Sequence, residues 1–167
     1  MPHSVYSHLW GTIAMISVFL SITLYFFGLQ EFFLTDVLKI RLQEICDDVS
    51  TSLTELIELK IASNSTGFTV KSLDIPTGIK EKGYYLEIKV DNNNRIYIYA
   101  RTLTYPYIES TSKLLIKHSS YVSVLSPGEY NNIVVEDVLF SGVNNPIIIV
   151  FRDIDGTIKI GLGRLRG

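Results

Sequence analysis

The chain has 167 residues, of which 47% are hydrophobic and 19% are charged, and its formal net charge is -2 at pH 7. This charge, together with the lack of any basic cluster, gives no reason to expect a nucleic-acid partner. Cys46 is the only cysteine. It therefore predicts neither a disulfide within the chain nor a metal centre, and we interpret it as a small buried apolar residue.

Residues 9–29 contain no Asp, Glu, Lys or Arg, and the uncharged run extends from residue 2 to residue 30. Roughly 20 apolar residues at 1.5 Å per residue cross the hydrocarbon core of a bilayer, and a single segment in lipid must be helical. We therefore predict a short N-terminal segment over 1–8 and a transmembrane helix over 9–29. The alternatives are a cleaved secretory signal, which usually has a basic n-region and a shorter apolar core, and a buried core helix.

Residues 30–62 continue the helix with an amphipathic pattern. Apolar residues recur at steps of three and four, at Leu34, Leu38, Leu42, Ile45, Val49, Leu53, Leu56 or Ile57, and Ile61. This period predicts one apolar stripe that lies against another part of the molecule. The polar run 63–66 and Gly67 end the helix.

From residue 68 the apolar period changes to two, which is typical of strands. Residues 84–90 and 96–101 alternate on either side of the turn 91–94 and predict a β-hairpin. Further strands are predicted over 68–73, 113–117, 121–125, 133–140, 147–151 and 157–162. About seven or eight short strands with frequent turn signals favour a sandwich. The predicted fold class is α+β: a long N-terminal helix, transmembrane and then amphipathic, followed by an antiparallel sandwich-like β domain over 63–167.

Residues 147–157 read as an apolar strand followed by Asp153-Ile154-Asp155-Gly156-Thr157. This stretch is similar to the strand and DxDGT loop of haloacid-dehalogenase-type phosphatases, in which the two aspartates would act beside Mg²⁺. Ten residues follow Thr157 in this sequence, too few for the parallel α/β fold of that family. We favour a β-hairpin with an Asp-Gly turn. A tethered enzyme that uses Asp153 and Asp155 is the third hypothesis for function.

No catalytic, cofactor-binding or metal-binding residues are legible elsewhere. The glycines of residues 161–167 precede no helix that could hold a phosphate, and His3, His8 and His118 are far apart in sequence. We therefore predict that the protein is not an enzyme and uses no cofactor.

Two features indicate surface roles. Asn64-Ser65-Thr66 is an N-glycosylation sequon, and its alternative interpretation is a polar helix end. Tyr85, Tyr97 and Tyr99 share the outward face of the hairpin. They predict either a contact surface for a partner subunit or surface polymer, or cross-strand pairing on a solvated face.

An apolar N-terminal helix that becomes amphipathic and is capped by a small β domain resembles type IV pilin-like proteins, particularly the archaeal pilin-like and archaellin-like ones. The pattern Phe68-Thr69-Val70, Ile75-Pro76, Ile79 and Tyr84-Tyr85 is similar to archaeal minor pilin-like proteins. The resemblance implies that a helix over 12–62 lies in a filament core with the β domain outward. It also implies Gly11 and Thr12 as the processing site.

No Lys or Arg precedes Gly11, and the early acidic helix residue of bacterial pilins is absent. These differences keep open an uncleaved, membrane-anchored binding or stator-like scaffold, similar to the β-sandwich stator proteins of the archaellum.

The small residues Gly11, Ala14, Ser17 and Ser21 give the helix a smooth face for close packing. Lys39 and Arg41 after the apolar run favour a cytoplasmic C-terminal domain by the positive-inside rule, whereas the sequon and the polar β domain favour the outside. We expect a single-pass cell-surface protein with its C-terminal domain outside. Its expected partners are the membrane, further copies of itself and other pilin-like subunits.

Overall fold

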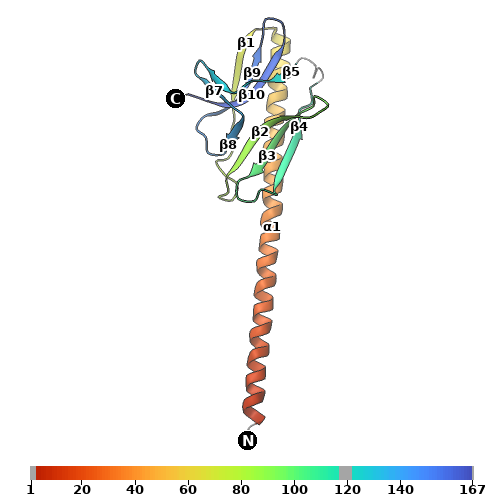
Figure 1. Cartoon of the computed structure of the whole chain (residues 1–167), viewed down its shortest axis with the longest axis vertical. Helices are drawn as coiled ribbons and strands as arrows, with labels where there is room; N and C mark the ends of the chain where they lie inside the picture. Colours follow the sequence, from red (N-terminus) through yellow and green to blue (C-terminus); the bar gives the residue numbers. More distant parts are fainter. Residues whose placement is uncertain (1–2, 117–121, 167) are drawn as a thin grey trace. The chain divides into compact units, whose positions relative to one another are not determined.

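A computed structural model describes residues 3–116 and 122–166 of the chain. It contains one helix, α1 (His3–Ser63), followed by ten strands within the described residues. The chain divides into two compact units, residues 1–37 and residues 38–167. The predicted fold class is confirmed: a long N-terminal helix packs in the second unit against β-sheets that form a sandwich-like domain (Figure 1).

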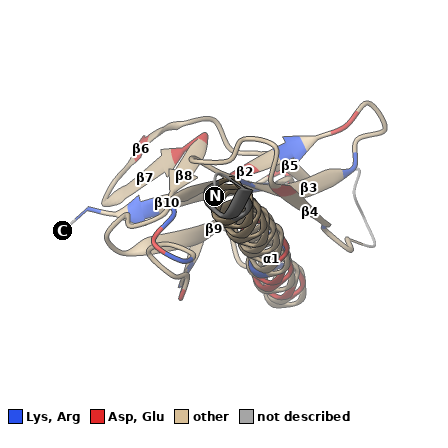
Figure 2. Ribbon diagram, turned by 90° about the horizontal axis from the view of Figure 1, so that it is seen from below, with Lys and Arg blue, Asp and Glu red and all other residues tan. Residues whose placement is uncertain are grey.

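The first unit is the apolar part of α1. By length and composition, α1 qualifies as a membrane-spanning helix, the one such helix in residues 3–116 and 122–166. Its apolar side chains are exposed, with Met15 77% and Leu24 70% accessible. Residues 3–30 of this unit contain no Lys, Arg, Asp or Glu, and Figure 2 shows charged residues farther along α1 and on the strands.

The second part of α1 supplies one side of the core of the β domain. The predicted stripe is buried at Leu38, Leu42, Ile45, Val49, Leu53 and Ile57. Cys46 is also fully buried, as expected. Leu34, the first residue of the predicted stripe, is only half-buried. The prediction was wrong at Ile61, which is 42% exposed, because the adjacent Lys60 turns inward instead and is 2% exposed. The Lys60 ammonium is accommodated there because it donates to Thr69 Oγ1 at 2.9 Å.

The four-stranded sheet has the order β4-β3-β2-β8. Its members are β2 (Tyr84–Val90), β3 (Ile96–Thr102), β4 (Glu109–Lys113) and β8 (Val138–Phe140). β2 and β3 form the predicted hairpin, with Tyr84 opposite Thr102 and Val90 opposite Ile96. Among its inner side chains, Leu86 and Ile98 are completely buried. The other face carries the tyrosines.

The six-stranded sheet has the order β1-β9-β10-β7-β6, and β5 pairs with β10 beside β7. Its members are β1 (Gly67–Ser72), β5 (Val122–Val124), β6 (Gly128–Tyr130), β7 (Ile133–Glu136), β9 (Pro146–Arg152) and β10 (Ile158–Leu165). All pairings are antiparallel except that of β5 with β10, which is parallel.

Strand β9 is buried on both faces of this sheet. Ile148 and Val150 share the α1-facing side with Thr69, the partner of Lys60. Ile147 and Ile149 face the opposite way, into a small cluster with Leu125 and Val135. This double burial explains why the sequence of β9 is continuously apolar instead of alternating.

Side chains of α1 cover the outer edge of β4. Gln43 Nε2 donates to the Thr111 carbonyl at 3.2 Å, and Ser50 Oγ donates to the Lys113 carbonyl at 3.1 Å. Between them, Cys46 Sγ lies 3.6 Å from the Ser110 carbonyl. An uncovered strand edge leaves backbone groups free to pair with other chains, so this contact satisfies and protects the edge.

Two strand predictions were wrong, and one strand was missed. The polar segment Glu109–Lys113 forms β4, whereas residues 114–116 of the predicted strand 113–117 are not in a strand and residue 117 lies outside the described residues. The predicted strand 133–140 is divided at Asp137 into β7 and β8, which belong to different sheets. The short β6 was not predicted, because three polar-flanked residues carry no periodic signal.

Candidate interaction surfaces

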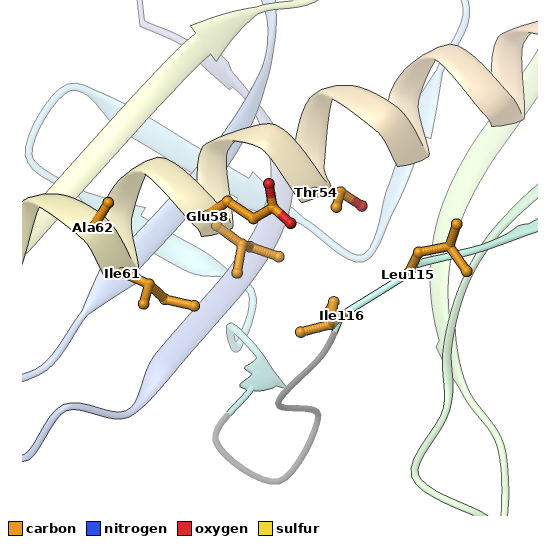
Figure 3. A pocket seen from close by; sticks show the side chains of 7 residues that line it. Thr54, Glu58, Ile61, Ala62, Leu115 and Ile116 are labelled. Atoms are coloured by element: carbon orange, nitrogen blue, oxygen red, sulfur yellow. The ribbon is translucent and has the colours of Figure 1, made fainter.

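An apolar pocket of about 200 Å³ lies beside the last turns of α1 (Figure 3). The helix contributes Thr54, Ile57, Glu58, Ile61 and Ala62, and the segment after β4 contributes Leu115 and Ile116. Leu115 is 75% exposed at its edge. The pocket is large enough for an apolar side chain. Only Thr54 and Glu58 line it with polar side-chain atoms, so it suits binding of an apolar group better than catalysis.

The three tyrosines of the hairpin lie on one face of the four-stranded sheet, as the alternation predicted, but they differ in accessibility. Tyr99 is only 7% exposed. Its hydroxyl donates to Glu109 Oε2 at 2.6 Å, and the Lys89 ammonium lies 3.5 Å from its ring centroid. Burial and this hydrogen bond to Glu109 raise the pKa of Tyr99 well above its ordinary value.

Tyr85 and Tyr97 are half-buried and remain the more accessible rings. Tyr85 packs against Tyr99 and Phe140 with centroid separations of 6.1 and 6.2 Å, and Tyr97 donates to Asp91 Oδ2 at 3.2 Å. Cross-strand aromatic packing of this kind stabilises a sheet. The same face, with Phe140 48% exposed, offers a partly apolar surface for a partner.

The Asp153–Gly156 segment is the turn of the β9–β10 hairpin, as favoured from the sequence. Asp153 Oδ1 accepts from the Ile154 backbone N–H at 2.8 Å, and Asp155 Oδ1 accepts from that of Thr157 at 2.9 Å. The hydrogen bond from Thr157 lowers the pKa of the Asp155 carboxyl. Both carboxylates therefore hold the turn, and the antiparallel pairing of β9 with β10 excludes the parallel phosphatase arrangement.

The glycines near the end of β10 permit close packing of strands. A methyl group at Gly163 would overlap the backbone carbonyl of Val134, and one at Gly161 would approach Val135 Cγ1 at 3.2 Å. Such close approach of two backbones is a usual reason for glycine inside a strand. These glycines serve the sheet and form no phosphate loop.

The residues singled out in the apolar part of α1 are all helical. Thr12 Oγ1 donates to the His8 carbonyl at 2.9 Å, so the Gly11–Thr12 bond lies inside a hydrogen-bonded turn. On the small face, Ser17 Oγ donates to the Ile13 carbonyl at 2.9 Å and Ser21 Oγ to the Ser17 carbonyl at 2.8 Å. This face therefore satisfies its hydroxyl groups within the helix, as lipid or a neighbouring helix requires.

Among residues 3–116 and 122–166, no three His, Cys, Asp or Glu side chains are grouped as a metal site would need. His8 lies in α1, and His118 lies outside the described residues. Asn64 is exposed at the end of α1.

Comparison with known proteins finds no matching family model, no matching curated protein and no matching solved structure.

Proposed function

We propose that this chain is a non-enzymatic, single-pass protein of the cell membrane that serves as a pilin-like subunit, or minor component, of an archaeal type IV pilus-like filament. The observation that carries the proposal is the division of one helix into two chemically different parts. Its first part has no Asp, Glu, Lys or Arg up to Gln30 and exposes most of its apolar side chains. From Leu38 onward its apolar stripe is buried by the β domain.

Each part suits one task of such a subunit. An exposed, uncharged helix is stable in lipid or among identical helices, and in water it would associate. Small residues at Gly11, Ala14 and Ser17 allow neighbouring helices to approach closely. The β domain, which we place outside the cell, would then present its tyrosine face and apolar pocket to other subunits.

Mild cross-linking of intact cells that express the full chain tests this assembly. We expect a ladder of large species in wild type, and fewer large species when Ala14 and Ser17 are both replaced by Leu. The matched control replaces Ile16 and Phe19, which lie on the opposite side of the helix with the same spacing, by Leu and keeps the ladder. A wild-type pattern of only monomer and dimer would contradict the filament.

The second candidate is an uncleaved, membrane-anchored binding or stator-like scaffold. The observation that favours it is the helical turn around Gly11 and Thr12, because a peptidase must open this turn before it reaches the bond. The absence of Lys and Arg before Gly11 also favours it.

The mass of the mature N-terminus separates the two candidates. A chain that begins at Thr12 supports the processed subunit. A chain that retains the residues before Gly11 supports the permanent anchor.

A further inference from the structure

The segment Asn64–Thr66 joins α1 to β1 and lies on the surface of the domain. Asn64, Ser65 and Thr66 are all exposed, and none lies in a helix or strand. It is the only Asn-x-Ser/Thr triplet in the 167-residue sequence. An acceptor of this kind needs an accessible loop, and here the structure supplies one.

The end of the helix explains the backbone conformation of Asn64, but it does not explain why the side chain is that of asparagine. Asn64 has a φ of 49°, and its N–H donates to the Ile61 carbonyl at 3.3 Å, as in a left-handed helix end. Glycine would serve this conformation at lower cost. Within residues 3–116 and 122–166, no hydrogen bond involves the Asn64 carboxamide or the Thr66 hydroxyl, whereas Ser63 and Ser65 bond to each other at 2.9 Å.

Large apolar side chains are exposed at the end of the domain that carries this segment. Leu59, in the last turns of α1, is 60% exposed. Ile154, at the tip of the β9–β10 hairpin, is 92% exposed, and it follows Arg152, which pairs with Gly67 of β1. Figure 1 shows this hairpin tip and the end of α1 at the same end of the domain. A hydrophilic covalent group at Asn64 would shield these side chains from other molecules.

We propose that Asn64 carries an N-linked oligosaccharide that covers this apolar end of the domain. The proposal rests on the proposed location of the β domain outside the cell. The donor is a lipid-pyrophosphate-linked oligosaccharide. Asn64 Nδ2 forms a bond to the anomeric carbon, the bond from that carbon to the phosphate oxygen breaks, and the lipid pyrophosphate leaves with the electron pair. The amide loses one proton to a base of the transferase.

The test is the mass of the proteolytic peptide that contains Asn64, taken from the full chain isolated from cells with an oligosaccharyl transferase. We expect a mass excess of whole sugar residues in wild type, and none in Asn64→Gln or Thr66→Ala. Thr66→Ser and Ser65→Ala keep the sequon and should keep the excess. Because residues 64–66 are exposed, all four variants are expected to fold. An unmodified wild-type peptide overturns the proposal, as does an excess that survives Asn64→Gln.

A reporter in the same domain separates this proposal from the question of location. Asp155→Asn changes the exposed tip to Asn-Gly-Thr, a second sequon, and preserves the side-chain oxygen that accepts from Thr157. If position 155 is modified and Asn64 is not, the domain is outside and the inference at Asn64 is wrong. If neither position is modified and protease added to intact cells leaves the domain uncut, both this inference and the outside location fail.

Discussion

At the scale of single residues, Cys46 shows how burial changes chemistry. Burial, with a smaller contribution from the charge of Asp47, raises the pKa of the Cys46 thiol to about 12. In an unfolded chain a thiol ionises at about 8.5. The unfolded state therefore loses this proton first, so the stability that comes from the neutral buried thiol is complete below about pH 8.5 and is lost as pH rises toward 12.

We expect the full chain in mild detergent to lose thermal stability between about pH 8.5 and pH 10.5, and Cys46→Ala to lose less over the same interval. Thiol reagents should label wild-type Cys46 slowly at pH 8 and rapidly in denaturant, because the folded protein holds little thiolate. Equal pH slopes for the two proteins, or rapid labelling of the folded chain, would show that the thiol is accessible.

Some of these single-residue features could be predicted from the sequence, and others could not. The apolar character of Cys46 and the turn at Asp153–Gly156 followed from local patterns, because hairpin chemistry involves only neighbouring residues. The inward turn of Lys60 could not be predicted from the sequence. It depends on the hydrogen bond to Thr69 of β1, and the helical period carries no information about contacts with another element.

At the scale of elements, the covered edge of β4 yields a prediction about α1. Ser50 is 5% exposed and donates to the Lys113 carbonyl at 3.1 Å. Ser50→Ala leaves that carbonyl without this partner inside the domain, and we expect it to lower the free energy of unfolding by about 1–2 kcal/mol.

Thermal and denaturant unfolding of the full chain in detergent measures this effect. The matched control is Thr51→Ala, whose side chain is the next along α1 and is exposed, so its change should stay within about 0.5 kcal/mol. If the two variants were equally stable, the contact between α1 and β4 would contribute nothing to the fold.

The same edge explains which strands could be predicted. β2 and β3 alternate because one face is buried and the other solvated, and that pattern is visible in the sequence. β4 has the sequence Glu-Ser-Thr-Ser-Lys and no apolar alternation. It is a strand because β3 pairs with it on one side and side chains of α1 bond its other edge. Those contacts link residues more than 60 positions apart, which sequence periodicity cannot detect.

At the scale of the whole molecule, the proposed membrane location yields a prediction about the apolar part of α1. Replacing both Ile16 and Leu20 by Arg places two charges near the middle of the uncharged run. Each Arg at the centre of a membrane helix disfavours insertion by about 2.5–3.5 kcal/mol. We expect this variant to leave the membrane fraction under alkaline extraction, which retains the wild-type chain.

The control for this experiment is the pair of substitutions Gln30→Arg and Phe33→Arg, which adds the same charge outside the predicted span. These arginines lie at its end, where long basic side chains reach the interface, so the control should remain in the membrane. Wild-type protein that is extracted as readily as the double-arginine variant would refute the anchor.

The central position of β10 has a consequence for synthesis of the protein. β10 pairs with β9, β7 and β5, so it holds the six-stranded sheet together, and among the described elements it follows the other five strands of that sheet in the chain. Until it emerges, the stripe of α1 from Leu38 to Ile57 has no complete sheet to pack against. Contacts this distant in sequence form slowly, and the nascent chain exposes surface that aggregates meanwhile. A chaperone that holds the helix until β10 has emerged would therefore raise the yield of folded protein.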